Sequence, residues 1–147
     1  MKHIHLFVFL ACMVMVSALA LPSTTLAAEG IKWYSYDEGL ALGKADKKKV
    51  YINFYADWCG YCRKMEKETF QDSRVISFLN QNYISIRINS DKEKKLSRQY
   101  NVSGLPANIF VSDTGENIGN QPGYLGPADF MKVITFVYEE KYKPKTK

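Results

Sequence analysis

The chain has 147 residues and a formal net charge of +5, with 20 Lys and Arg against 15 Asp and Glu. The positive charge is scattered, and no basic motif indicates binding of nucleic acid. Both His residues lie near the N-terminus, so the rest of the chain lacks a His for general-base catalysis or metal ligation. This argues against hydrolases and metalloenzymes, and we expect neither a metal nor a cofactor.

Residues 1–28 have the layout of a secretory signal, with a positively charged start, an apolar run over 6–21 and small residues before a cut near Ala28. The apolar run is slightly long for a signal core and slightly short for a spanning helix. An uncleaved N-terminal anchor is therefore the alternative, and only then would the protein be attached to a membrane. In either case we expect an exported protein, periplasmic or secreted, whose residues 29–147 form one domain. Cys12 is interpreted as part of the signal core.

Helices and strands alternate along residues 29–147. The first predicted helix runs from the Ser35 to Glu38 capping box to about Lys47, with Leu40, Ala41 and Ala45 toward the core, and is followed by a strand from Val50 to Tyr55 and a helix after Cys59. A further helix is capped by Asp72 or Ser73 and has Val75, Ile76, Phe78 and Leu79 on one side. The remaining predicted elements are a strand from Tyr83 to Ile88, a charged helix from Lys92 to Tyr100, a hairpin of strands 107–112 and 117–119, and a helix from Pro127 to about Lys141.

Trp58-Cys59-Gly60-Tyr61-Cys62 is the strongest chemical signal. The motif lies where the strand ending at Tyr55 passes into a helix. At the first turn of that helix, unpaired backbone amides and the positive end of the helix dipole favour the thiolate of Cys59. Cys59 is therefore the predicted attacking sulfur. Cys62, one turn deeper and expected to be less exposed, is the predicted resolving sulfur.

Other uses of two Cys at this spacing fit less well. A structural zinc site needs four Cys or His ligands, which residues 29–147 do not supply. Attachment of haem requires a His after the second Cys, where the sequence has Arg63. A purely structural disulfide closing so small a loop would constrain little of the unfolded chain. The pair is therefore interpreted as a redox-active disulfide.

The order of elements, together with Tyr55-Ala56-Asp57-Trp58-Cys59-Gly60-Tyr61-Cys62 and Gly104-Leu105-Pro106, resembles the thioredoxin superfamily. Among its members the sequence is similar to exported thioredoxin-like proteins and to the C-terminal domain of DsbD-type interchange proteins. The resemblance implies an α/β thioredoxin-like fold with a central mixed β-sheet flanked by helices. It also implies that Pro106 is cis and packs against the Cys pair, and that the backbone of Leu105 binds substrate peptide.

Two positions concern proton transfer. Asn53 stands where members of the superfamily carry a buried Asp that helps to move the proton of the resolving thiol, and Asn cannot accept that proton. Glu66 follows Cys62 by four residues and is expected on the same helix face. A Glu occupies the corresponding place in the DsbD-like motif. We hypothesise that Glu66 assists deprotonation of Cys62; a solvated surface glutamate is the alternative.

Aromatic residues are divided between the rim of the site and the core. If the fold is correct, Tyr55, Trp58, Tyr61 and Gly123 lie near Cys59, and Trp58 and Tyr61 form an apolar docking surface for protein segments. The residues expected in the core are Trp33, Phe54, Phe78, Phe110 and Phe136. Arg87 is given no role.

The predicted function is exchange of disulfides with protein substrates, as a monomer served by an unidentified redox partner. Reduction is favoured because Gly60-Tyr61 lacks the His typical of strong oxidants at the second position. The alternative is a thiol pair that handles copper in cytochrome assembly without catalysis.

Overall fold

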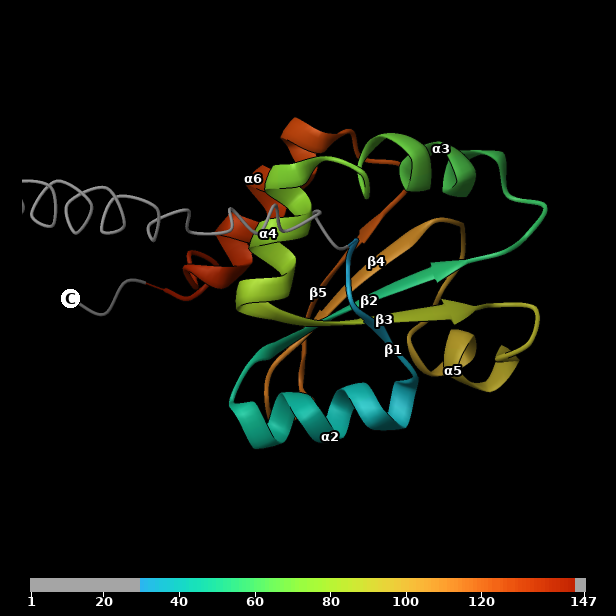
Figure 1. Cartoon of the computed structure of the whole chain (residues 1–147). Coiled ribbons are helices and arrows are strands. Elements are labelled where there is room, and N and C mark those ends of the chain that lie inside the picture. Colours follow the sequence, from blue (N-terminus) through green and yellow to red (C-terminus); the bar gives the residue numbers. More distant parts are fainter. Residues whose placement is uncertain (1–29, 145–147) are drawn as a thin grey trace, which may run out of the picture.

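The computed structural model describes residues 30–144, so the predicted signal segment and its alternative as an anchor lie outside the described residues. A five-stranded mixed sheet with the order β1-β3-β2-β4-β5 is covered by helices on both faces (Figure 1). The elements are β1 (Trp33–Tyr34), α2 (Tyr36–Asp46), β2 (Lys49–Tyr55), α3 (Gly60–Glu68), α4 (Ser73–Asn82), β3 (Tyr83–Asn89), α5 (Lys94–Gln99), β4 (Ala107–Val111), β5 (Asn117–Pro122) and α6 (Pro127–Tyr138). This arrangement confirms the expected fold class. Within residues 30–144, no helix combines the length and the apolar character needed to cross a membrane.

The pairing of strands makes β2 the centre of the sheet. Strands β1 and β2 each run parallel to β3, whereas β4 runs antiparallel to both β2 and β5. Five consecutive residues of β2, from Val50 to Phe54, are buried. A strand covered on both faces is expected to be apolar throughout rather than alternating, which explains why β-branched and aromatic residues fill β2 from Val50 to Phe54 except at Asn53. The sequence of this strand therefore fixes its central position.

Two cores lie on opposite faces of the sheet. On the face covered by α3, α4 and α6, the buried cluster is formed largely by Tyr51, Met65, Leu79, Phe110 and Phe130. On the other face, buried residues including Ile52, Phe54, Ile86 and Ile109 pack against partly buried side chains of α2 and α5. Alternate residues of β2 serve opposite faces, as the period of two in a strand requires.

Helix α2 packs on the sheet through glycines, which corrects one prediction. Gly39 and Gly43 are the buried residues of this helix, whereas Ala41 and Ala45, predicted to face the core, are exposed. A Cβ atom at Gly43 would lie 2.5 Å from Cγ2 of Val50. The glycines are therefore packing positions that let the helix approach the sheet closely, and the helix is rotated relative to the prediction.

Three smaller differences have local causes. Ser35 is the N-cap of α2 as predicted, but its side chain makes no capping hydrogen bond to the backbone and instead lies 3.5 Å from Glu38 Oε2. Phe136, predicted in the core, is 45% exposed because it lies on the outer side of α6, whose buried residues are Phe130, Ile134 and Val137. The short strand β1 was not predicted from the sequence, although Trp33 packs against the core as expected.

Candidate active site

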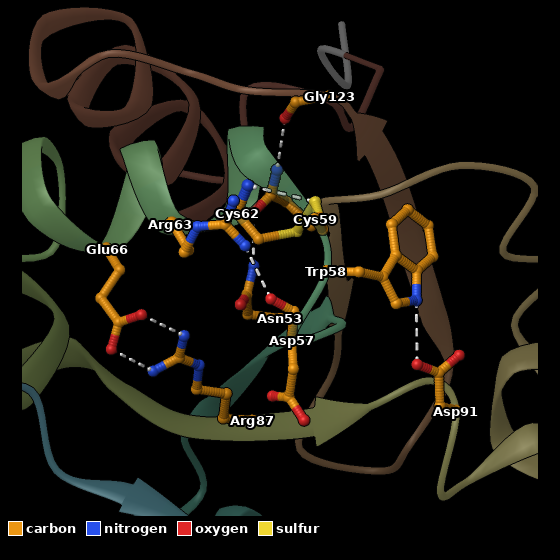
Figure 2. The surroundings of a disulfide bond; sticks show 11 residues. Asn53, Asp57, Trp58, Cys59, Cys62, Arg63, Glu66, Arg87, Asp91 and Gly123 are labelled. Atoms are coloured by element: carbon orange, nitrogen blue, oxygen red, sulfur yellow. Dashed lines mark hydrogen bonds and ion pairs between the residues drawn. A yellow bond between two sulfur atoms is a disulfide. The ribbon is translucent and has the colours of Figure 1, made fainter.

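Cys59 and Cys62 form a disulfide at the start of α3, at the end of the sheet where β2 finishes (Figure 2). Cys59 is the N-cap of α3, and its Sγ accepts a hydrogen bond from the backbone N–H of Cys62 at 3.1 Å. A sulfur in this position satisfies one of the amide donors that a helix leaves free at its N-terminus. The same N–H can stabilise negative charge on Cys59 when the disulfide is reduced.

Exposure does not distinguish the two cysteines in the disulfide form. Cys59 and Cys62 are each 4% exposed, so the expectation that Cys62 is the less exposed residue is wrong for this oxidised state. The difference between them lies in their place in the helix, because Cys59 precedes the first turn and Cys62 lies inside it. The cap position, rather than exposure, separates their chemistry.

The segment before β4 packs against the disulfide. The Leu105-Pro106 peptide bond is cis, as the family resemblance implied, and Pro106 is buried. Leu105 packs on the small cluster formed by Ala56, Cys59 and Cys62. Leu105 is therefore brought beside the Cys pair by the ends of β2 and β4, although the two segments are far apart in sequence.

A buried amide network links the core to the rim of the site. Asn108 Oδ1 accepts hydrogen bonds from the hydroxyl of Tyr51 at 2.7 Å and from Nδ2 of Asn53 at 3.3 Å. The Nδ2 of Asn108 donates to the carbonyl oxygens of Gln121 and Gly123, at 3.0 and 3.1 Å. Asn108 was not predicted from the sequence. The sequence feature that could have indicated its role is that it is a polar residue in an otherwise apolar strand, and in the structure it lies opposite Asn53 in the β2–β4 register.

This network contains no carboxylate. Asn53 is 2% exposed, and Asn108 is completely buried. Burial raises the pKa of Tyr51 well above its ordinary value, so its hydroxyl stays protonated and acts as a donor. Neither Asn53 nor Asn108 can take a proton from Cys62, and their amides hold the strands and the Gly123 segment in place instead.

Glu66 extends from α3 toward β3 and binds Arg87 of that strand (Figure 2). Its two carboxylate oxygens accept hydrogen bonds from Nη1 and Nη2 of Arg87 at 3.0 and 3.1 Å. The hydrogen bonding by Arg87 lowers the pKa of Glu66. Arg87 itself lies over two aromatic rings, with Cζ 4.3 Å from the ring centroid of Tyr55 and 5.7 Å from that of Trp33. Sequence analysis gave Arg87 no role, and the structure makes it the partner of Glu66.

Trp58 forms one side of the rim. Its ring is 69% exposed, yet the indole Nε1 donates a hydrogen bond to Asp91 Oδ2 at 2.9 Å (Figure 2). A second link joins the same two segments, because Asn89 Nδ2 donates to Asp57 Oδ2 at 3.3 Å. The segment after β3 therefore holds the Trp58 ring in a defined orientation. Asp91 was not predicted from the sequence, because its partner lies in another segment.

Tyr61 and Tyr124 form the other side of the rim. Tyr61 is 66% exposed, and its ring centroid lies 6.4 Å from that of Tyr124. Nζ of Lys64 lies 4.7 Å from the Tyr124 centroid, and the Tyr124 hydroxyl donates to Glu68. The hydrogen bond to Glu68 raises the pKa of Tyr124. Tyr124 follows Gly123, whose N–H donates to the carbonyl oxygen of Pro106 at 2.8 Å.

Known proteins are similar to this chain in sequence. The family model described as a thioredoxin-like domain matches residues 36–138. Thiol:disulfide interchange protein DsbD of Vibrio vulnificus is 35% identical over 100 residues, which cover 65% of this chain and 17% of DsbD. The chain thus spans a small part of the curated relatives that it matches.

Solved structures agree on the fold. A thioredoxin from Thermus thermophilus superimposes with a TM-score of 0.68 at 30% identity, covering 74% of this chain and 88% of the thioredoxin. DsbH oxidoreductase superimposes with a TM-score of 0.70 over 87% of this chain and 98% of its own, and at 22% identity it supports the fold alone. With its Cys pair capping a helix beside a cis-proline, the chain belongs to the thioredoxin-like family of disulfide oxidoreductases.

Proposed function

We propose that this protein is an extracytoplasmic reductase of protein disulfides, with Cys59 as the attacking and Cys62 as the resolving sulfur. The observation that carries the proposal is the hydrogen bond from the Cys62 N–H to Cys59 Sγ at the N-terminus of α3. This donor and the helix dipole favour the thiolate of Cys59. Only the thiolate attacks a disulfide.

The reaction is two successive exchanges. The Cys59 thiolate attacks one sulfur of a substrate disulfide, forms a mixed disulfide and releases the other substrate sulfur as a thiolate. The Cys62 thiolate then attacks Cys59 Sγ, closes the Cys59–Cys62 disulfide and releases the second substrate sulfur. The substrate gains two electrons and the protein loses two. A redox partner with a dithiol must then reduce the protein by the reverse exchange.

Direction and location rest on separate observations. The Gly60-Tyr61 pair lacks the His that accompanies strong oxidants, and the similar proteins include a thioredoxin and an interchange protein. The signal-like composition of residues 1–28 supports export. The enzyme is proposed to act as a monomer. An extended segment of its protein substrate can lie on the surface formed by exposed Trp58 and Tyr61 and by the backbone of Leu105 beside cis-Pro106.

Glu66 is proposed to receive the proton of Cys62 only when its ion pair with Arg87 opens. The pairing lowers the pKa of Glu66, which makes the bound carboxylate a weaker base. Glu66→Gln should slow resolution of the mixed disulfide and alter its pH dependence, whereas Glu38→Gln on α2 is the matched control. An unchanged rate and pH profile in Glu66→Gln would show that Glu66 pairs with Arg87 and takes no part in proton transfer.

The first test is the equilibrium potential of the Cys pair against glutathione or dithiothreitol. We expect a potential of about −270 mV, as in thioredoxin. A potential of about −120 mV, typical of a strong oxidant, would instead indicate that the protein oxidises its substrates. Cys62→Ser should accumulate mixed disulfides with protein substrates, and Cys59→Ser should not. Stoichiometric copper bound to the reduced protein, with no trapped substrate, would favour the alternative of a copper-handling protein.

A further inference from the structure

The carboxylates of α3 both have partners within the protein, whereas most of its cations face solvent. Glu66 is bound by Arg87, and Glu68 accepts the hydroxyl of Tyr124. Arg63, Lys64 and Lys67, which the sequence of α3 also contains, are exposed. Arg87 and Glu66 offset one another, and Arg63 turns toward Asp57, whose carbonyl oxygen accepts from its Nη1 at 2.7 Å. Lys64 and Lys67 therefore stand against Glu68 alone on the remaining surface of α3. The side of the site formed by α3 therefore carries a positive field.

One of these cations, Lys64, adjoins the aromatic rings of the rim. Lys64 lies over the ring of Tyr124, which in turn lies beside the ring of Tyr61. Lys67 follows Lys64 by three residues and is its neighbour on the helix surface. We name Tyr61, Lys64, Lys67 and Tyr124 the α3 shelf. The shelf starts two residues after Cys59, so a protein segment bound there is close to the attacking sulfur.

The opposite side of the rim carries negative charge. Asp57 and Asp91 flank Trp58, and the groups that bind their carboxylates, the amide of Asn89 and the indole of Trp58, are both neutral. Arg63 reaches this side as well, because its Nη1 donates to the carbonyl oxygen of Asp57 at 2.7 Å, so two carboxylates stand here against one guanidinium. Lys92 follows Asp91 and Glu93 follows Lys92, so these two neighbours offset one another. The rim of the site is thus positive at the α3 shelf and negative beside Trp58.

We propose that the α3 shelf selects and orients protein substrates whose reactive cysteine has acidic residues on one side. This inference rests on the proposed function and assigns it a substrate class. Acidic side chains would lie against Lys64 and Lys67, and an apolar side chain of the same segment would lie on the rings of Tyr61 and Tyr124. The negative side of the rim disfavours the reversed orientation, so charge fixes the direction in which the segment lies.

The expected effect is moderate and depends on salt. Exposed ion pairs contribute little individually, and two of them correspond to about a three- to tenfold change in rate constant. Their field is screened over about 10 Å at 0.1 M salt, so the preference should decline as ionic strength rises. The overall positive charge of the protein would attract any acidic peptide, and only the shelf predicts that the side of the cysteine matters.

The test compares two isomeric peptide disulfides of equal charge. In one peptide three Glu residues precede the cysteine, in the other they follow it, and a third peptide carries Gln at all these positions. The reduced full-length protein reacts once with each in low salt and in 0.5 M salt, and the second-order rate constant for its oxidation to the Cys59–Cys62 disulfide is measured. The variant is Lys64→Gln with Lys67→Gln, and the matched control is Lys44→Gln with Lys47→Gln, which removes two exposed cations at the end of α2, on the opposite face of the sheet from α3 (Figure 1).

We expect one isomer to react about three- to tenfold faster than the other. The difference should disappear in high salt and in the shelf variant, and should persist in the control variant. Equal rates for both isomers, or a difference that the shelf variant retains, would overturn the inference while leaving disulfide reduction intact. Failure to reduce any of the three peptides would contradict the proposed function and the inference together.

Discussion

Replacing Asn108 by Ala should destabilise the protein strongly, because its side chain satisfies partners on two sides. The carbonyl oxygen of Asn108 accepts from the buried hydroxyl of Tyr51 and from the amide of Asn53, and its amide donates to two backbone carbonyls of the β5 end. Ala can accept none of these donors. The hydroxyl of Tyr51 would remain at a site that is 0% exposed, without an acceptor.

The magnitude follows from the groups left unpaired. A buried donor without a partner costs about 1 to 3 kcal/mol, and Asn108→Ala orphans two, on Tyr51 and Asn53. The carbonyl oxygens of Gln121 and Gly123 belong to exposed or half-exposed residues and can bind water instead. The expected loss is therefore about 2 to 6 kcal/mol of the free energy of unfolding. Tyr51→Phe removes the donor and leaves Asn108 bound to Asn53, so it should cost only about 1 kcal/mol.

Urea denaturation of the oxidised protein measures these losses. With a slope of about 2 kcal/mol per molar urea, Asn108→Ala should lower the midpoint by about 1 to 3 M. In the double variant the orphaned hydroxyl is absent, so the combined loss should fall below the sum of the single losses by at least about 1 kcal/mol. A loss below 1 kcal/mol for Asn108→Ala, or additive single losses, would refute the assignment of the network.

Two further changes test contacts on either face of the sheet. Glu66→Gln should lower the free energy of unfolding at pH 7 by no more than about 1 kcal/mol, because the pair with Arg87 is half exposed. Since the pKa of Glu66 is lowered in the folded protein, the difference from the natural protein should shrink as the pH falls below about 4.3. Unfolding titrations at pH 7 and pH 3 that give the same difference would contradict this expectation. Gly39→Ala should lower the midpoint of thermal unfolding, because overlap of the new Cβ with Ile86 costs about 1 to 3 kcal/mol against about 1 kcal/mol gained in helix propensity. The control Ala41→Gly, at an exposed position of the same helix, should cost about 1 kcal/mol through propensity alone; a stabilised Gly39→Ala would show that the helix can move outward.

Much of the fold could be predicted from local patterns. The largely apolar run of β2, the cap at Asp72 and the hairpin of strands 107–112 and 117–119 each have a signature within a few residues, and the corresponding elements form where expected. The Cys pair was predicted for the same reason, since its chemistry depends on a helix start that the neighbouring sequence encodes. The cis bond before Pro106 came from resemblance to a family rather than from the residues.

The remaining features depend on contacts between distant segments. Position 39 requires glycine because the side chain of Ile86 in β3 leaves no room there for a Cβ atom. The sequence of α2 alone does not indicate this contact. The partner of Glu66 is Arg87, 21 residues later, and the contact of Lys64 with Tyr124 depends on where the end of β5 leads. Such pairs are set by the tertiary structure, whereas helical spacing along α3 reports only which side chains share a face.

The hydrogen bond between Trp58 and Asp91 also has a consequence for the free energy of complex formation. An exposed aromatic ring normally loses rotational freedom when a partner binds, at a cost of about 0.5 to 1.5 kcal/mol for an immobilised side chain. Here that freedom is already reduced in the unbound protein, because the indole N–H is held by a neighbouring segment. On the proposed docking surface, Trp58 would therefore be a preorganised anchor that a partner meets with little reorganisation.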